Sequence, residues 1–388
     1  MMADGKRIKV LHIITRLDPG GSSTNTLETV ARLDPAVYDV HLVAGRTTDP
    51  FGVARAFIQR HDIDCRYVQS LVREVRPLQD AVAFFTLWRI MCEGKYDLVH
   101  THTSKAGVLG RWAAHAAGVK KIVHTPHGHI FYGYFSGFVT KIYLGLERWS
   151  STITTRLIAL TPKGIQEHLA LGVGVAGQWV SIPSGIDTEV FKLAINARGP
   201  YRQLLGLEDQ DIVLVCAARL EPVKNHRVLI DLVAGLRAEF PMIKLVLLGD
   251  GPQRAMLVQH AREAGVAGHV VFAGFRQDVA LVFSACDFFV MASLNEGMGR
   301  SVLEAMSVGL PVVVGRAGGL PAIVNDGVNG FLVPPTEVDA WVRAVKRLLM
   351  DPALRLRFSR EAKKGVHDAY SVTHMVRQIE QVYAGLFV

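Results

Sequence analysis

The chain has 388 residues, of which 49% are hydrophobic and 20% are charged, and its formal net charge is +8. This composition excludes a disordered protein, and the length predicts two folded domains. The positive charge suits an anionic substrate or an anionic membrane surface, and the absence of a long basic block disfavours nucleic acid. The four cysteines include no C-x-x-C pair, which indicates a reducing, cytoplasmic compartment. No apolar run reaches the roughly 18 to 20 residues of a membrane span, and the first one is too short for a signal peptide.

Apolar runs alternate with amphipathic stretches along the whole chain, which is typical of parallel sheets covered by helices on both faces. In the first half, strands are predicted at residues 9–14, 38–45, 97–103, 121–125 and 157–161. In the second half, they are predicted at residues 211–218, 243–249, 269–274, 287–292 and 310–315. The fold class is therefore α/β, with two doubly wound, Rossmann-like parallel-sheet domains.

The domain boundary is expected near Asp187. Residues 180–200 contain Pro, Ser and Gly, interrupt the periodic pattern and are interpreted as a turn or linker. This divides the chain into a first domain at 1–187 and a second at 188–370. Residues 371–388 carry apolar side chains at helical spacing, so a terminal amphipathic helix is predicted, and we expect it to return to the first domain.

The turn after the first predicted strand argues against a nicotinamide dehydrogenase. It reads TRLDPGGSS, with Gly20 and Gly21 adjacent and no G-x-G-x-x-G. The dinucleotide fingerprint of a Rossmann domain is therefore missing.

The stretch LNEGMGRSVLEAMSVGLPVV, residues 294–313, places Glu296 and Glu304 eight positions apart around a strand, turn and helix. Gly297 and Gly299 allow a ligand to approach the backbone where the helix begins, and free N–H groups there favour an anion. The spacing suits a ligand with phosphate in its middle and hydroxyl groups at both ends, such as a nucleotide sugar. The alternative is a plain helix start, with one acidic residue near its positive end and a second facing solvent.

Further motifs follow the same order as in a known family. They are Gly20-Gly21, HTPHG around His127, PSGID at 183–187, ARLEPVKN at 218–225 and LGDGP at 248–252. With the two glutamates, they resemble the glycosyltransferases of family 4 over almost the whole chain. The resemblance implies the GT-B fold, in which two Rossmann-like domains face each other across a cleft. It also implies retaining transfer from a nucleotide-sugar donor, with no metal and no cofactor.

The resemblance assigns roles in the second domain. Arg219 and Lys224 correspond to the basic pair that clamps the donor diphosphate and stabilises the leaving nucleotide. Glu304 corresponds to the residue that binds the ribose hydroxyls, and Glu296 to the one that contacts the donor sugar. The backbone N–H groups expected to meet the phosphates belong to Gly297, Met298, Gly299 and Arg300.

In the first domain, the resemblance assigns Gly20 and Gly21 to the loop that approaches the diphosphate, and His127 to the histidine that contacts the transferring sugar. A tight turn is the alternative for the two glycines. His100 and His102, with Phe131 and Tyr132, are expected on the acceptor side.

Two other patterns suggest metals. The two H-x-H pairs, at 100–102 and 127–129, can signal zinc, but no carboxylate lies at a suitable spacing. Asp62 and Asp64 form the D-x-D pattern of the other glycosyltransferase fold, and we interpret them as a surface loop. No metal site is therefore predicted.

The sequence departs from the family pattern at two positions. Ala322 stands where an acidic residue is usual, which bears on the donor-sugar contacts. Arg300 stands where an apolar residue is common, and either adds charge near the phosphates or caps a helix.

Residues 128–149 are expected to border the acceptor side. In this segment, helical spacing near basic residues is found for Phe135, Phe138, Ile142 and Leu146. They either belong to the core or lie on an anionic membrane. Because HTHTSKAGVLGRWAAHAAGVKKIVHTPHG resembles family members that build bacterial surface polysaccharides, we expect a UDP-sugar donor, a polyprenyl-diphosphate-linked saccharide acceptor and peripheral attachment to the cytosolic membrane face. The alternatives are an epimerase or hydrolase of the same fold, or a non-catalytic sugar-nucleotide-binding protein.

Overall fold

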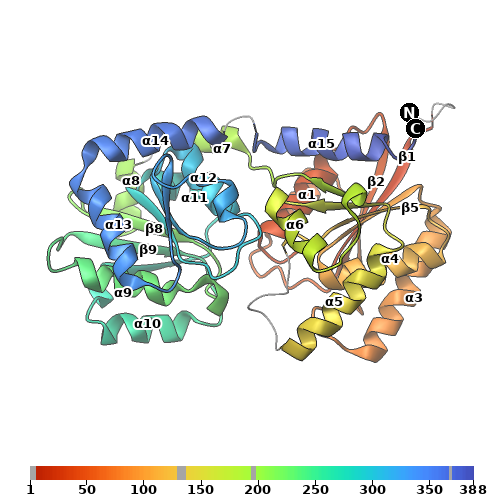
Figure 1. Ribbon diagram of the computed structural model, residues 1–388, viewed down its shortest axis with the longest axis horizontal. Helices are drawn as coiled ribbons and strands as arrows, with labels where there is room; N and C mark the ends of the chain where they lie inside the picture. The colour runs from red at the N-terminus through yellow and green to blue at the C-terminus, as the bar shows by residue number, and fades with distance from the viewer. Residues whose placement is uncertain (1–5, 129–136, 194–197, 367–368) are drawn as a thin grey trace. The chain divides into compact units, whose positions relative to one another are not determined.

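The computed structural model describes residues 6–128, 137–193, 198–366 and 369–388. The chain divides into two compact units (Figure 1). The first unit comprises Met1–Gly185 and Val372–Val388, and the second comprises Ile186–Ser371. Within the described residues, none of the helices is both long and apolar enough to cross a membrane.

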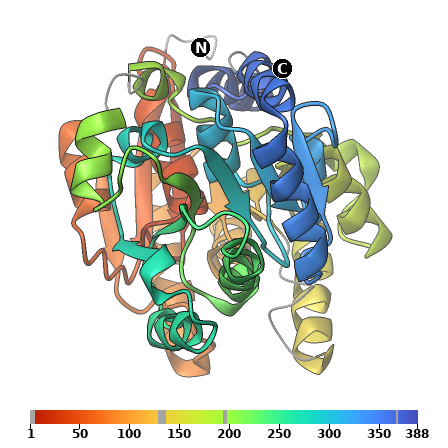
Figure 2. The ribbon, with the colours of Figure 1, turned by 90° about the vertical axis from the view of Figure 1, so that its left-hand side faces the viewer.

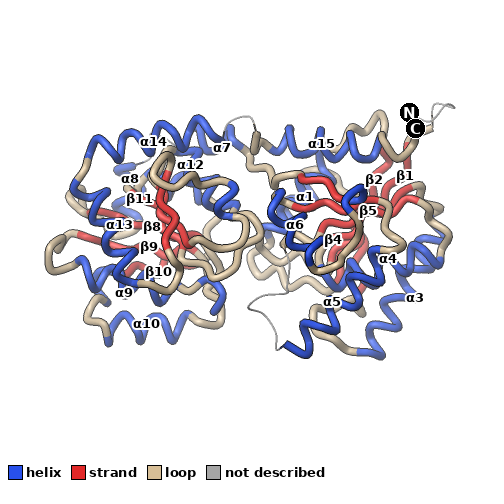
Figure 3. Tube along the Cα trace, viewed as in Figure 1, coloured by secondary structure: helices blue, strands red, loops and turns tan. Residues whose placement is uncertain are grey.

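The first unit contains a seven-stranded parallel sheet in the order β3-β2-β1-β4-β5-β6-β7 (Figure 3). Its strands are β1 (Ile8–Ile14), β2 (Tyr38–Gly45), β3 (Cys65–Val68), β4 (Leu98–His102), β5 (Lys121–Thr125), β6 (Arg156–Ala159) and β7 (Trp179–Ser181). Its helices are α1 (Gly21–Arg32), α2 (Val53–Arg60), α3 (Pro77–Gly94), α4 (Ser104–Ala116), α5 (Gly137–Ser151), α6 (Pro162–Ala170) and α15 (Val372–Ala384).

The second unit contains a six-stranded parallel sheet in the order β10-β9-β8-β11-β12-β13, with helices on both sides (Figure 2). Its strands are β8 (Ile212–Ala217), β9 (Ile243–Leu248), β10 (Val270–Gly274), β11 (Phe288–Met291), β12 (Val312–Gly315) and β13 (Gly330–Val333). Its helices are α7 (Thr188–Leu193), α8 (Arg198–Leu204), α9 (His226–Leu236), α10 (Arg254–Glu263), α11 (Val279–Ser284), α12 (Arg300–Val308), α13 (Val338–Met350) and α14 (Pro352–Val366).

The predicted α/β class with two parallel sheets is confirmed, and each predicted strand overlaps an observed one. The predicted linker is partly wrong, because its first residues, Val180 and Ser181, belong to edge strand β7. The strand list also omitted β3 and β13. The strands β3, β7 and β13 are all short. Because β3 and β7 also carry partly exposed side chains, neither has the continuous apolar run of a buried strand.

Both sheets place a topological switch point beside their first strand. In the first unit the order reverses between β1 and β4, and in the second between β8 and β11. Open parallel sheets bind ligands at the carboxyl ends of the strands flanking such a point. The turns after these four strands are therefore where a site is expected.

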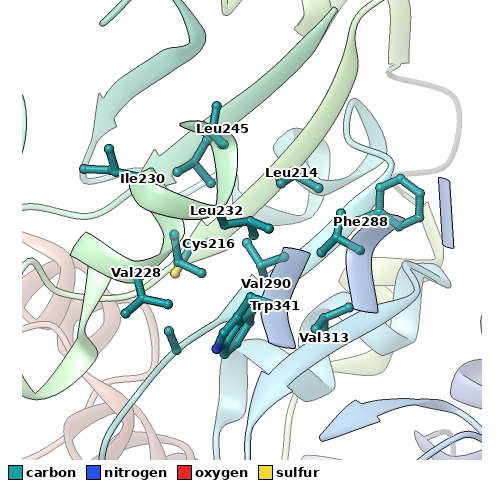
Figure 4. Packing of buried hydrophobic residues seen from close by; sticks show 14 of the residues in the cluster. Leu214, Cys216, Val228, Ile230, Leu232, Leu245, Phe288, Val290, Val313 and Trp341 are labelled. Carbon is teal, nitrogen blue, oxygen red and sulfur yellow. The ribbon is translucent and has the colours of Figure 1, made fainter. Parts of the chain in front are cut away.

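The core of the second unit packs between its sheet and α9 and α13 (Figure 4). Trp341 of α13 is fully buried in this cluster with Leu214 and Val290, and its Nε1–H donates to Pro334 O at 3.0 Å. This packing holds the ends of β8 and β11 rigidly, which positions the turns that follow them.

The C-terminal helix α15 covers one face of the first sheet, beside α1. Its buried face includes Met375, Ile379 and Tyr383, which pack with Val10 and Leu98 of the central strands. The apolar spacing that predicted this helix therefore corresponds to a row of core contacts.

Candidate active site

In the second unit, the turns after β8 and β11 meet at the switch point. Lys224 follows β8, Glu296 follows β11, and their Nζ and Oε2 atoms lie 2.5 Å apart. The backbone N–H of Leu294 also donates to Val223 O at 2.8 Å. The two turns are thus joined by an ion pair and by a main-chain hydrogen bond.

A third turn, after β12, holds Glu296 from the other side. The Gly319 N–H donates to Glu296 O at 2.8 Å. Gly318 has φ 51°, and a Cβ added there would lie 2.0 Å from the same oxygen. Only glycine allows this approach, so the Gly-Gly turn determines where the Glu296 backbone lies.

The helix α12 begins directly behind Glu296. Gly299 precedes it with φ 84°, a left-handed conformation that favours glycine. Met298 is 3% exposed, so it offers its backbone rather than its side chain to a ligand. The arrangement suits an anion at the helix N-terminus, beside Lys224.

Glu304 lies one turn into α12, and Arg300 Nη2 is 3.5 Å from its Oε1. Burial raises the pKa of Glu304, and the Arg300 guanidinium opposes this shift. Arg300 is thus both the first residue of the helix and the partner of this carboxylate. A desolvated carboxylate of this kind is a good acceptor for hydroxyl groups of a ligand.

Arg219 lies two residues after β8, and its Nη2 is 2.7 Å from Glu221 Oε1. Its side chain is 42% exposed, so it can reach a ligand at modest cost. Sequence reasoning missed Asn225, which has φ 52° and whose Nδ2–H donates to Pro335 O at 2.8 Å. The sequence feature that could have identified Asn225 is its position after Lys224 and directly before a helix, where asparagine often adopts this left-handed conformation.

In the first unit, Gly20 and Gly21 are exposed at the start of α1, after β1. His127 lies two residues after β5 and has φ 59°. A non-glycine residue in this strained region is often held there for function. His127 thus combines a strained backbone with a position at the carboxyl edge of the sheet.

Behind His127, a row of buried imidazoles runs along the sheet. His127 Nε2 is 2.9 Å from His102 Nδ1, and His102 Nε2 is 3.0 Å from His12 Nδ1. The other nitrogen of His12 is 3.3 Å from Tyr383 Oη of α15. Tyr383 Oη is 2.6 Å from His100 Nδ1, and His100 Nε2 is 2.8 Å from Thr125 Oγ1.

These imidazoles are neutral at physiological pH. Burial lowers the pKa of His12 and of His127 to about 3. Burial, followed by the neighbouring imidazoles, lowers the pKa values of His100 and His102 well below the usual range. Desolvation penalises the charged form, and each neutral ring then has one donor and one acceptor nitrogen.

Three of the rings, His12, His100 and His102, each place a nitrogen within 4.8 Å of the others, a spacing that a metal ion can bridge. All six of their nitrogens already have hydrogen-bonding partners. Among the described residues, the partners of these rings are imidazoles and hydroxyls and not carboxylates, so the charge of a divalent ion would not be offset. The arrangement of these three rings is therefore that of a hydrogen-bonded network rather than that of a metal site.

Several expectations for the first unit require correction or lie outside the described residues. His100 and His102 are 0% and 1% exposed, so they offer almost no atom to an acceptor, and the Tyr383 hydroxyl of α15 lies on His100. Phe131, Tyr132 and Phe135 lie outside the described residues, as does the side chain of Phe138. Asp62 and Asp64 are exposed in the turn before β3, as predicted for a surface loop, and Asp64 Oδ2 is 2.6 Å from His41 Nδ1.

Residues 19–190 match the family described as Glycosyltransferase Family 4, and residues 198–365 match the Glycosyl transferases group 1. The chain is 29% identical, over 396 residues and all of both chains, to a UDP-Gal:alpha-D-GlcNAc-diphosphoundecaprenol alpha-1,3-galactosyltransferase of Escherichia coli. It is 30% identical to a D-inositol 3-phosphate glycosyltransferase of Actinosynnema mirum, over 86% of this chain and 79% of the relative.

Among solved structures, HepE of Anabaena in complex with UDP-glucose has a TM-score of 0.83 at 25% identity, over 98% of this chain and 100% of HepE. The lipopolysaccharide glycosyltransferase WaaG has the same fold, with a TM-score of 0.76 at 19% identity over 95% of this chain and 99% of WaaG. Both sheets, both family matches and these relatives agree: the chain belongs to the family 4, group 1 glycosyltransferases of GT-B fold.

Proposed function

We propose that the protein transfers a hexose from a UDP-sugar to a polyprenyl-diphosphate-linked saccharide, with retention of anomeric configuration, in the synthesis of a bacterial surface polysaccharide. The galactosyltransferase that is similar over the whole chain is named for UDP-galactose and a diphosphoundecaprenol acceptor. The HepE structure contains UDP-glucose. These relatives support the donor and acceptor classes.

The observation that carries the proposal is the group of charges at the switch point of the second unit. Lys224 and Arg219 follow β8 and lie on the same edge of the sheet as the N-terminus of α12. Two cations and the N-terminus of a helix favour a diphosphate there, and they stabilise the charge that develops on the leaving nucleotide. Protein groups would then supply the positive charge that a metal supplies in other transferases.

The remaining residues have distinct roles in this proposal. Glu304 accepts hydrogen bonds from the ribose hydroxyls, and Glu296 from the donor sugar. The backbone N–H groups of residues 297–300 meet the phosphates. In the first unit, Gly20 and Gly21 leave room for the diphosphate, and His127 contacts the transferring sugar.

The proposed site of action is the cytosolic face of the membrane, because a polyprenyl-linked acceptor resides there. Helix α5 leaves Ile142 50% exposed and Trp149 55% exposed, with exposed Lys141 and Arg148 beside them. Apolar side chains next to cations favour an anionic bilayer surface. This supports peripheral attachment through the first unit.

Thermal unfolding with a panel of nucleotide sugars tests the donor. At about a hundredfold excess over its Kd, the right donor stabilises the binding unit by about 2.7 kcal/mol, and the wrong ones by nothing. Protection by none of them would contradict the proposal.

Product analysis then separates the proposed transferase from its alternatives. Incubation with UDP-galactose and a GlcNAc-diphosphoundecaprenol analogue should give a disaccharide whose new linkage is axial, seen in the anomeric proton coupling. Free hexose would indicate a hydrolase, an altered UDP-sugar an epimerase, and binding without turnover a non-catalytic protein. The same assay after exhaustive chelation tests metal independence, since a requirement for added magnesium or manganese would contradict it.

A further inference from the structure

The buried row of imidazoles links the C-terminal helix to His127. It passes from Thr125 through His100, Tyr383, His12 and His102 to His127, and its contacts range from 2.6 to 3.3 Å. Its four inner groups, His100, Tyr383, His12 and His102, are each 0–1% exposed, so water does not compete for their hydrogen bonds. Each proton position in the row is therefore determined by the positions on either side.

This row has two arrangements in which each inner imidazole or hydroxyl donates one hydrogen bond and accepts one. In the first, each group donates toward Thr125, and His127 carries its proton on Nε2, which faces His102. In the second, each group donates toward His127, which accepts from His102 at Nε2 and carries its own proton on Nδ1. The two arrangements thus present opposite functions at Nδ1, an acceptor in one and a donor in the other.

The Thr125 hydroxyl distinguishes the two arrangements. Among the described residues, Thr125 Oγ1 hydrogen-bonds to His100 alone, and the side chain is 3% exposed. In the first arrangement its own hydrogen has no acceptor, and a buried donor without a partner is costly. In the second, it donates to His100 Nε2, and every buried donor of the row is satisfied.

The contact distances of Tyr383 favour the first arrangement. Tyr383 is closer to His100 (2.6 Å) than to His12 (3.3 Å), and hydroxyl donors make the shorter bonds. In the second arrangement, the uneven distances mean only that one hydrogen bond is longer than usual. In the first arrangement, the Thr125 hydrogen has no acceptor, so one hydrogen bond is lost completely. The second arrangement is therefore the more stable one.

We propose that Thr125, His100, Tyr383, His12 and His102 are positioning residues that hold His127 as the Nδ1–H tautomer, so that it presents a hydrogen-bond donor to the reacting groups. Nδ1 of His127 bonds to none of the residues that the structure describes, so a substrate oxygen can take this place. The catalytic half of the proposal rests on the proposed transferase function. The tautomer itself does not.

Tyr383 gives the C-terminal helix a role in the reaction. It lies 371 residues from His12 in sequence and bridges His12 and His100, which are register partners on β1 and β4. The helix α15 therefore closes the only gap between the two halves of the described row. Without the Tyr383 hydroxyl, His127 loses its connection to Thr125.

The tautomer can be measured directly in the protein without substrate. Protein labelled with nitrogen-15 in its 15 histidines gives long-range proton–nitrogen correlations that distinguish the two tautomers, and His127→Asn assigns the His127 signal. Wild type should show His127 as the Nδ1–H form. The Nε2–H form as the major one, or an equal mixture of both forms, would overturn the proposal.

Two variants interrupt the row, and two matched variants do not. Tyr383→Phe and Thr125→Val each remove one hydroxyl, and both should convert His127 to a mixture, because the bias lost is about tenfold. Thr125→Ser should keep the wild-type signal. Tyr38→Phe should also keep it, because Tyr38 packs against Tyr383 at 5.8 Å between ring centres but bonds elsewhere.

An unchanged His127 in both interrupting variants, or a mixture in both matched variants, would overturn the role of the hydroxyls. Tyr383→Phe keeps the packed ring and tests the row even if Thr125→Val does not fold. One equivalent of zinc should leave the signals of His12, His100 and His102 unchanged. Zinc-induced shifts of all three would show a metal site in place of the row.

The kinetic measurement tests the catalytic half. Tyr383→Phe should lower kcat about twofold, because an equal mixture halves the share of the productive tautomer, and it should leave the KM for the donor unchanged, because a wrong tautomer impairs chemistry rather than binding. A mixed tautomer with full kcat would overturn the positioning role. If no donor is turned over by wild type, the proposed function fails, while the tautomer measurement still tests the row.

Discussion

Lys224 and Glu296 lie 72 residues apart in the sequence and form an ion pair with 2.5 Å between Nζ and Oε2. Both side chains are mostly buried, with 19% and 15% of their surface exposed. A diphosphate that binds Lys224 must compete with Glu296 for the same ammonium group. We therefore expect donor binding to release Glu296 for hydrogen bonds to the donor sugar.

The basic pair is the first target for mutation. Arg219→Ala and Lys224→Ala should each lower kcat/KM by roughly ten- to a thousandfold, or ~1.4 to 4 kcal/mol of transition-state stabilisation. Steady-state kinetics with the matching donor measure this effect. Arg227→Ala, an exposed residue of neighbouring α9, is the control and should behave as wild type. Normal kinetics in both variants would show that the turn does not contact the diphosphate.

Glu296→Gln separates binding from chemistry. The neutral side chain no longer competes for Lys224, so UDP should bind at least as tightly as to wild type, while turnover falls. Calorimetric titration of UDP and a turnover assay on the same preparation test both halves. Weaker UDP binding in this variant would contradict the competition between Glu296 and the diphosphate.

For Glu304 the opposite result is expected. Glu304→Gln keeps the shape but weakens an acceptor that Arg300 and burial hold in place, so nucleotide affinity should fall by roughly ten- to a hundredfold. The calorimetric titration used for Glu296 measures it. Glu361→Gln, on the surface of α14, is the control. Wild-type affinity for UDP in Glu304→Gln would exclude the ribose contact.

Much of this site could be predicted from the sequence, because buried parallel strands are continuous apolar runs and the turns after them carry the motifs. Glu296 was singled out in this way, whereas Arg219 and Lys224 were assigned through the resemblance of the ARLEPVKN turn to the family pattern. His12 was not, because it stands inside an apolar strand, and Tyr383 was recognised only as part of a helix face. Their contact depends on strand register and on where α15 packs, which no local pattern encodes.

The buried imidazoles should make stability depend on pH. The pKa values of His12 and His127 fall from 6.5 unfolded to about 3 folded, so the unfolded chain binds more protons between these values. The free energy of unfolding should therefore be highest above pH 6.5 and fall as the pH is lowered toward 3, by up to about 1.4 kcal/mol per pH unit for each imidazole.

Urea unfolding at pH 5, 6 and 7 tests this, with tryptophan fluorescence as the signal, since four of the five tryptophans lie in the first unit. Burial also lowers the pKa of His124 well below its usual range, so His124→Gln should give a shallower slope than wild type. His115→Gln, the same change at an exposed position, should leave the slope unchanged. A stability independent of pH in this window would show that the imidazoles are not buried neutral.

Peripheral membrane attachment should depend on the outer face of α5. Wild type should sediment with anionic liposomes at low salt and be released at high salt, because cations near Ile142 are screened as salt rises. Ile142→Ser with Lys141→Gln should reduce sedimentation several-fold, through loss of one apolar and one electrostatic contact. Val328→Ser is a matched control, because Val328 is also 50% exposed but belongs to the second unit. If wild type stays in the supernatant at low salt, or if the α5 and Val328 variants bind equally well, attachment through α5 is wrong and a soluble acceptor becomes the better hypothesis.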